Sequence, residues 1–282
     1  MLQGLYHPNT VDEAIALLAQ DPQARPMAGG ASLVAMLNAG VIEPAALVSL
    51  ASIEEIKGIS VMPDGRIRIG AFTRHRETAE YALPLGAAAA VRQAASLIAN
   101  VTVRNMGTIG GAIAFADPGL DYPPALVASG AEVEIASPFA RRVVPAREFF
   151  VDWYLTALEP GELVVAVVLP RPGEGAQGVY IKHARVAGDY ATASVAACRL
   201  GDGSVSVAVG ACGPIPIAND AANTLLSADR SGAAITEAGA LLERQADPLD
   251  DVRGSAEYRR QLIPRLLLRA IRSLEATEGE KP

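Results

Sequence analysis

The spacing of hydrophobic residues predicts a mixture of helices and strands in the first part of the chain. Thr10 and Glu13 fit a capping box, in which the threonine side chain accepts a hydrogen bond from the first helical turn. The apolar spacing that follows predicts a helix that ends before Asp21-Pro22. A second helix is expected from Ser32 to Asn38, and a third, alanine-rich one within 84–100. Short apolar or alternating runs predict strands at 25–28, 46–50, 67–71, 133–135 and 163–169.

The last third of the chain has a different pattern. The stretch 170–175 (PRPGEG) combines proline and glycine and is the best linker candidate. Beyond it, a tight hairpin at 201–203 (GDG) joins predicted antiparallel strands, and helices are expected from Asn219 onward. Pro264 should kink the last helix or split it in two. The predicted fold class is therefore α+β, with an N-terminal region of about 170 residues followed by a sheet-plus-helices domain.

Charge and cysteine content exclude several classes of function. The 24 basic and 31 acidic residues give a net charge of -7 without a basic run, so a nucleic-acid partner is not expected. The N-terminus lacks the pattern of a signal peptide and no apolar run approaches the roughly 20 residues of a membrane span, so we expect a cytoplasmic protein. Cys198 and Cys212 are too few for an iron–sulfur cluster. Any metal chemistry would have to come from another chain.

Two glycine-rich turns are the strongest candidates for ligand binding. The first, 28–32 (AGGAS), lies between a predicted strand and helix, and the second, 108–111 (TIGG), lies in a passage, 103–124, that we expect to be irregular. Paired glycines let consecutive backbone amides form a concave surface for an anion, so two such turns suit the two phosphates of a dinucleotide. Ordinary turns are the alternative for each. Neither turn is a Rossmann or P-loop motif.

The remaining candidates are single polar residues. Asp117 is expected to cap a helix that begins at Pro118. Asp121 fits either an acceptor for a sugar hydroxyl or ring N–H, or a structural role. Residues 182–185 (KHAR) lie on a predicted strand and are a candidate for binding; the alternative to a functional role is a solvated cationic edge strand. His7 and His75 are interpreted as structural, and no arrangement of residues suggests a nucleophilic triad.

Four segments of the chain resemble, in order, the flavin subunit of the xanthine dehydrogenase / carbon monoxide dehydrogenase family. They are PMAGGASLVAMLNAG, NVTVRNMGTIGGAIAFADPGLDYPPAL, KHARVAGDYATASVAA and SAEYRRQLIPRLLLRAI. The resemblance implies two α+β FAD-binding subdomains like those of vanillyl-alcohol oxidase, within 1–175 and split near residue 57. It also implies that residues 176–282 form a domain resembling the carbon monoxide dehydrogenase flavoprotein C-terminal domain. Ala112, where family members often have Asn or Ser, departs from the pattern.

The resemblance also implies a set of cofactor contacts. The two glycine loops hold the FAD pyrophosphate and neighbouring groups, Lys182 lies near the flavin, and Tyr190 matches a position that covers the isoalloxazine ring in some members. Val164 and Ile98 match apolar lining positions, with core packing as the alternative. The full set of implied FAD-binding residues is Ala28, Gly29, Gly30, Ala31, Ser32, Leu33, Ile98, Thr108, Ile109, Gly110, Gly111, Asp121, Val164, Lys182 and Tyr190.

The implied function is electron transfer within a molybdenum hydroxylase. Electrons would leave a molybdenum-pterin cofactor on a large subunit, cross [2Fe–2S] clusters on a small subunit, and reach FAD on this chain, from which an external acceptor removes them. A dimer of heterotrimers is expected, and no catalytic acid or base is needed. Two alternatives are a stand-alone FAD-dependent oxidase of small alcohols or phenols and a non-redox module that binds nucleotides or assembles a complex.

Overall fold

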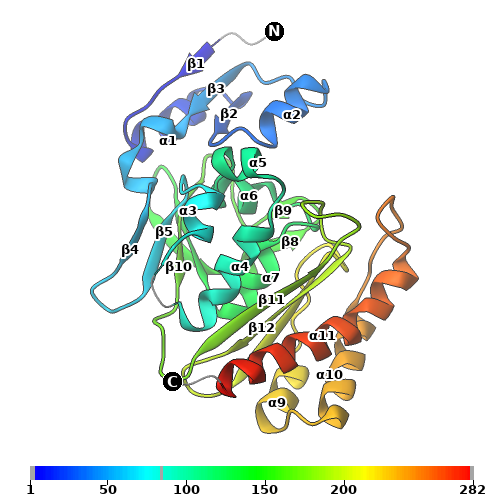
Figure 1. The fold of residues 1–282 in the computed structure, drawn as a ribbon. Coiled ribbons are helices and arrows are strands. Elements are labelled where there is room, and N and C mark those ends of the chain that lie inside the picture. The colour runs from blue at the N-terminus through cyan, green and yellow to red at the C-terminus, as the bar shows by residue number, and fades with distance from the viewer. Residues whose placement is uncertain (1–3, 83–84, 280–282) are drawn as a thin grey trace.

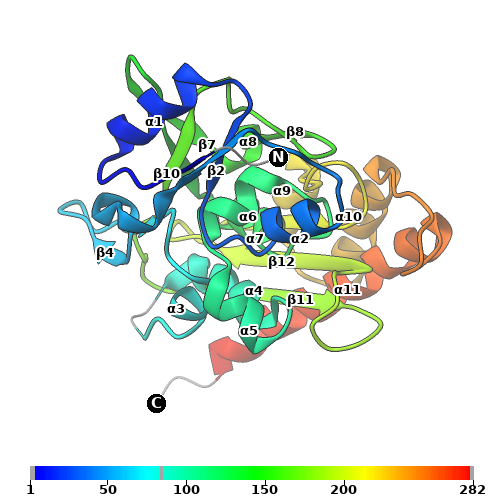
Figure 2. The same cartoon turned by 90° about the horizontal axis from the view of Figure 1, so that it is seen from above.

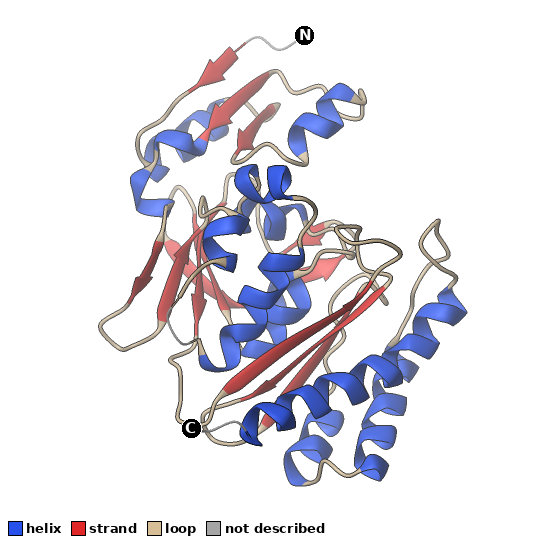
Figure 3. Ribbon diagram, viewed as in Figure 1, coloured by secondary structure: helices blue, strands red, loops and turns tan. Residues whose placement is uncertain are grey.

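Three layers of structure follow one another along the chain, as Figure 1 shows. The computed structural model describes residues 4–82 and 85–279. A small N-terminal sheet lies above a central sheet with its helices, and a third sheet with the C-terminal helices completes the molecule (Figure 3). None of the helices in those two ranges has the length and apolar character needed to cross a bilayer.

The N-terminal layer is a parallel sheet with strand order β1-β3-β2 and two short helices. Its elements are β1 (Gly4–Tyr6), α1 (Val11–Gln20), β2 (Ala24–Met27), α2 (Leu33–Asn38) and β3 (Ala46–Ser49). The helix predicted after Thr10 is confirmed, since the Thr10 hydroxyl accepts a hydrogen bond from the Glu13 amide at 3.1 Å. The Glu13 carboxylate reaches back one residue further than a capping box requires, to the Asn9 amide at 2.7 Å.

The central layer is an antiparallel sheet with strand order β4-β5-β10-β6-β7. Two 3-10 turns, Leu50–Ser52 and Glu54–Ile56, lead into it. Its strands are β4 (Ile59–Val61), β5 (Ile67–Gly70), β6 (Glu132–Ala136), β7 (Arg141–Pro145) and β10 (Leu163–Leu169). Every residue of β10 is buried, as expected from its unbroken apolar run. A bulge between Val164 and Ala166 interrupts the pairing of β10 with β6.

Helices and one hairpin cover this sheet. They are α3 (His75–Ala79), a 3-10 turn (Gly86–Ala88), α4 (Ala89–Leu97), α5 (Val101–Met106), α6 (Ile109–Phe115), α7 (Tyr122–Ser129), α8 (Ala146–Phe149), β8 (Phe150–Asp152) and β9 (Leu155–Thr156). The expectation of an irregular passage at 103–124 is wrong, because α5, α6 and the start of α7 occupy most of it. The side chains of Asn100 and Thr108 each accept an amide hydrogen bond at a helix start, so local caps overcome the weak helical propensity of the glycines.

The role predicted for Asp117 is also corrected. No helix begins at Pro118 in the described chain, and α7 begins four residues later at Tyr122. Asp117 instead accepts a hydrogen bond from the Gly119 amide at 2.8 Å, which closes a turn, and Ala116 before it adopts a left-handed φ of 50°. This turn sets the direction in which the chain enters α7.

The C-terminal layer is an antiparallel sheet of order β11-β12-β13 packed between helices. Its elements are β11 (Gln177–His183), β12 (Ala193–Arg199), β13 (Val205–Gly210), α9 (Asp220–Ala228), α10 (Gly232–Gln245) and α11 (Ala256–Gly279). Alternate strand residues face opposite sides. Val195 and Val207 pack with the C-terminal helices, whereas Tyr180 and Ala196 join the core of the preceding layers.

Pro264 lies inside one continuous helix and does not split it in two. Its neighbours Ile263 and Leu266 are buried in the C-terminal core, and this packing offsets the hydrogen bond that the proline cannot donate. The proline ring lies against Gly239 of α10, where an added β-carbon would be 3.0 Å from the Pro264 β-carbon. The glycine therefore provides the space that the proline occupies.

Replacing Gly239 with valine is expected to lower the free energy of unfolding by about 1–3 kcal/mol, because the added methyl groups would overpack this helix contact. Chemical denaturation of the purified chain measures the effect. Gly232→Val is the matched control, since Gly232 begins the same helix and a β-carbon there meets no atom within 4 Å. Equal stability of the two variants would show that the contact imposes no constraint.

Candidate functional site

A cavity of about 450 Å³ lies where the first two layers meet the loop between β11 and β12. The loop before α2 approaches α5 and α6 from above (Figure 1), and α2 projects over α6 and α7 in the view from above (Figure 2). All residues that the resemblance assigned to the cofactor line this cavity except Ile109 and Lys182. Segments far apart in the sequence are thus gathered around one space.

The first glycine turn is pressed against the junction of α5 and α6. A β-carbon at Gly29 would overlap the carbonyl oxygen of Met106, and Gly30 has a φ of 74°. Both positions therefore require glycine. The following amides, of Ala31, Ser32 and Leu33, have no hydrogen-bond acceptor in the part of the chain that the structure describes. They form a short row of open donors, as anion binding requires.

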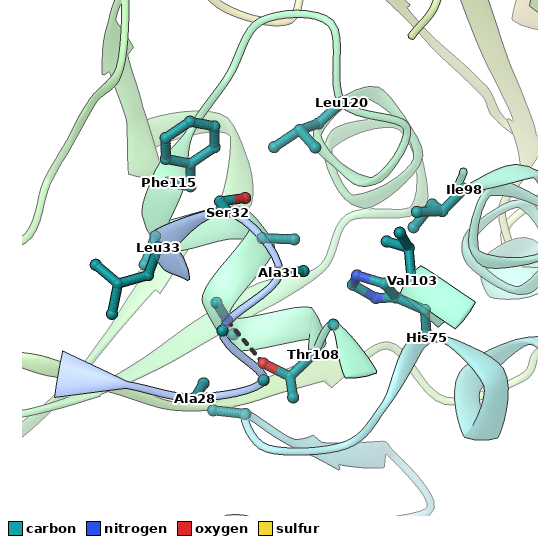
Figure 4. A pocket seen from close by; sticks show the side chains of 18 of the residues that line it. Ala28, Ala31, Ser32, Leu33, His75, Ile98, Val103, Thr108, Phe115 and Leu120 are labelled. Carbon is teal, nitrogen blue, oxygen red and sulfur yellow. Dashed lines mark hydrogen bonds between the residues drawn. The ribbon is translucent and has the colours of Figure 1, made fainter. Parts of the chain in front are cut away.

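The second glycine turn differs from the expectation that its amides are open. The Ile109 amide donates to the Thr73 carbonyl at 3.0 Å and the Gly110 amide to the Ala71 carbonyl at 2.9 Å. The Gly111 amide donates to the Thr108 hydroxyl, which caps α6 (Figure 4). This turn therefore begins a helix instead of lying in a loop. It contributes Thr108 and the side-chain-free surfaces of Gly110 and Gly111 to the cavity wall.

Ile109 points into the core instead of the cavity. Its side chain is fully buried among the central layer residues. Gly110 packs so closely on Ala71 that an added β-carbon would lie 2.5 Å from the Ala71 β-carbon. These two residues position the start of α6 against the central sheet.

Asp121 is the buried acidic group of the cavity. Its carboxylate accepts hydrogen bonds from the Tyr180 hydroxyl at 2.7 Å and from the Lys182 ammonium at 3.0 Å. Burial raises the pKa of Asp121, and the nearby charge of Lys182 and the two hydrogen bonds oppose that rise. Lys182 also donates to the Leu97 carbonyl at 3.2 Å. Lys182 does not line the cavity itself, but it is hydrogen-bonded to Asp121, which does.

Residues 182–185 were expected, in one alternative, to form a solvated cationic edge strand. The position at the sheet edge is confirmed, but Lys182 is not solvated. β11 is at the edge of its sheet, but the Lys182 side chain is only 6 % exposed. A buried ammonium needs a partner charge, and Asp121 supplies it. The pair ties β11 to the start of α7.

Apolar side chains form much of the remaining wall. Val164 and Ile98 belong to the hydrophobic core, as the core-packing alternative expects, and they also line the cavity. The bulge beside Val164 alters the alternation of β10 at this point. Tyr190 borders the cavity as well and keeps 37 % of its surface exposed.

The sequence did not identify several lining residues. Val103, Phe115 and Leu120 contribute apolar surface, and His75 points from α3 toward the cavity (Figure 4). The His75 imidazole Nδ1 lies 3.2 Å from the Tyr122 hydroxyl. Burial, with a smaller effect of the Arg104 charge, lowers the pKa of His75 to about 4. His75 is therefore neutral at physiological pH. It packs against Tyr122 in the protein interior and also forms part of the cavity wall.

Because the pKa of His75 is lower in the folded protein than its ordinary value of 6.5, the unfolded chain binds more protons between these values. Folding stability should thus fall as pH decreases from about 6.5 to 4. Between pH 7 and pH 5 the wild type is expected to lose about 2 kcal/mol more than His75→Gln. Urea unfolding at both pH values measures this difference, and parallel losses in the two proteins would contradict it.

Two family models match nearly the whole chain. One describes the FAD binding domain in molybdopterin dehydrogenase and matches residues 2–172, and the other describes the CO dehydrogenase flavoprotein C-terminal domain and matches residues 179–274. The predicted α+β fold, an FAD-binding domain followed by that C-terminal domain, is confirmed.

Relatives and solved structures agree with these matches. The chain is 35% identical over 279 residues to the carbon monoxide dehydrogenase medium chain of Afipia carboxidovorans, covering 96% of each protein. It is 31% identical to the xanthine dehydrogenase FAD-binding subunit of Escherichia coli, again covering 96% of each. A chain of the carbon monoxide dehydrogenase structure from Hydrogenophaga pseudoflava superposes with a TM-score of 0.93 at 32% identity, covering 98% of both chains. The chain therefore belongs to the family of FAD-binding medium subunits of the molybdenum hydroxylases, which are oxidoreductases.

Proposed function

We propose that this chain binds FAD in the cavity and passes electrons from partner subunits to an external acceptor. The observation that carries the proposal is the combination, in one cavity, of open backbone donors at Ala31–Leu33 and a buried carboxylate at Asp121. A dinucleotide needs both, because its pyrophosphate is anionic and its sugar and ring groups include donors. The bound flavin ring would supply the redox chemistry.

The residues around the cavity fit such a cofactor. The amides of Ala31, Ser32 and Leu33 and the Ser32 hydroxyl would face the pyrophosphate. Gly111 would allow it to approach the start of α6, since no side chain stands there. Asp121 would accept from a sugar hydroxyl or ring N–H, while Lys182 keeps its charge balanced.

The apolar part of the wall would enclose the aromatic ring system. Val164 and Ile98 offer flat apolar contact, and Tyr190 would cover the ring from the side of the β11–β12 loop. Ile109 and Lys182 are proposed to act indirectly, through the position of α6 and through Asp121.

Electron supply from another chain is part of the proposal. Both cysteines are buried, and burial raises the pKa of Cys212 to about 12, so neither thiol is suited to bind a metal. Among the described residues no group of three His, Cys, Asp or Glu side chains is placed to hold a metal ion. The relative from Afipia carboxidovorans is named a medium chain. A large molybdopterin-binding subunit, a small [2Fe–2S] subunit and a dimer of such heterotrimers are the proposed assembly, in the cytoplasm.

The division of the chain is likewise a proposal. An FAD-binding region of residues 1–175, split near residue 57, would be followed by a C-terminal region of residues 176–282. The family matches at 2–172 and 179–274 support the main boundary. The start of β4 at Ile59 supports the split.

Replacing Gly111 with leucine should abolish FAD retention while the protein remains folded, because the new side chain would enter the cavity beside Ala28. The absorption spectrum of purified protein after incubation with FAD, with circular dichroism as the measure of folding, tests this. Gly232→Leu, at the start of α10, is the control. Normal flavin absorption in folded Gly111→Leu would contradict the assignment of this loop.

A second experiment separates electron transfer from a stand-alone oxidase. In the proposed function the flavin receives its electrons from partner subunits, so no side chain of this chain has to take a proton from an organic substrate. We expect no reduction of the bound flavin when small alcohols or phenols are added to the isolated chain without oxygen. Bleaching of the flavin absorption by such a compound, without partner subunits, would favour the oxidase.

A further inference from the structure

Arg253, in the segment before α11, contacts the loop between β11 and β12 at two neighbouring residues. Its guanidinium carbon lies 5.0 Å from the ring centroid of Tyr190, and its Nε lies 3.2 Å from the Asp189 carboxylate. Asp251 lies 3.5 Å from the other side of the same guanidinium. One cation is thus held between two carboxylates and faces an aromatic ring.

The loop itself forms part of the cavity wall. Gly188, Asp189 and Tyr190 all line the cavity, whereas Arg253 does not. Gly188 has a φ of 84°, and a β-carbon there would lie 2.8 Å from the Ala99 carbonyl oxygen. The backbone before Tyr190 is therefore fixed against the cavity by a glycine contact.

The backbone after Tyr190 is fixed by Arg259 of α11, the helix that follows the segment carrying Arg253. The buried Arg259 donates to the Thr192 carbonyl at 2.7 Å and also pairs with Asp251. Asp251 connects Arg259 with Arg253, so the three charged residues form one continuous chain. This chain ends at the Tyr190 ring.

The Tyr190 ring is confined by neighbouring residues. On one side Gly119 lies so close that an added β-carbon would be 3.1 Å from the ring. Arg253 provides the cationic contact. An exposed tyrosine has several staggered rotamers available, and a contact that favours one of them determines where the ring lies relative to the cavity.

We propose that Arg253 is a positioning residue, which holds the Tyr190 ring in the cavity wall against the flavin. This inference rests on the proposed function. The planar guanidinium suits the task because it faces the ring while its Nε–H donates to Asp189 in a fixed direction, which a lysine ammonium does not do.

The competing interpretation is an ordinary surface ion pair, which contributes little. Arg147 offers a matched comparison, because its guanidinium makes two hydrogen bonds to Asp220, at 2.6 Å and 3.1 Å, and neither residue lines the cavity. Loss of Arg147 removes an ion pair without affecting Tyr190. An effect seen on replacing Arg253 but not on replacing Arg147 is therefore attributed to the position of the Tyr190 ring.

The experiment uses the full chain loaded with FAD and measures flavin fluorescence at equal flavin occupancy. A tyrosine ring packed on a flavin quenches its fluorescence, so Arg253→Met should give a several-fold rise, and Arg253→Lys a smaller one. Tyr190→Leu sets the fully unquenched level. The double variant should be no brighter than Tyr190→Leu alone, because Arg253 acts through Tyr190.

Hydrogen exchange of the FAD-free chain gives a second measurement. Residues 184–190 should exchange faster in Arg253→Met than in the wild type, and Arg147→Met should leave both this exchange and the fluorescence unchanged. Wild-type fluorescence together with wild-type exchange in Arg253→Met, or the same changes in Arg147→Met, would overturn the inference. A wild-type chain that retains no FAD would contradict the proposed function, and hydrogen exchange would then still decide whether Arg253 holds the loop.

Discussion

The close contact between the first glycine turn and the carbonyl of Met106 is the constraint on which the cavity depends. Because Gly29 has no side chain, the loop before α2 can touch the junction of α5 and α6. Gly30 then turns the chain so that the next amides face the open space. The N-terminal layer and the central layer are joined at this point, and the cavity lies beside it.

Local patterns in the sequence were sufficient to predict most elements and one of the two glycine turns. The Thr10 cap, the buried strand β10 and the hairpin at 201–203 depend on residues near one another in the chain. The second turn was only partly predictable, since the acceptors for its amides are the carbonyls of Thr73 and Ala71, which the fold brings from another segment. Periodicity carries no information about such partners.

The same distinction applies to the polar residues of the cavity. The local sequence leaves Asp121 open between an acceptor and a structural role, and only the family resemblance points to Lys182. The structure adds that the two residues form one buried pair, with Tyr180 as a further hydrogen-bond donor to Asp121. His75 has no sequence signal beyond being a lone histidine, and only the packing of α3 against Tyr122 places it beside the cavity. Of the two outcomes predicted for Pro264, the split of the last helix is wrong, since the helix continues through the proline, whose ring lies against a glycine of a different helix.

The two faces of the C-terminal sheet have a consequence for how the protein holds together. Tyr180, Ala196, Cys198 and Ala208 belong to the same hydrophobic core as residues of the central layer, on the other side of the proline-rich linker. Cutting the chain at that linker would leave both halves with a large apolar surface in water. The two regions that the family models recognise separately are therefore expected to be evolutionary modules that share a single cooperative unfolding transition, and not autonomous folding units.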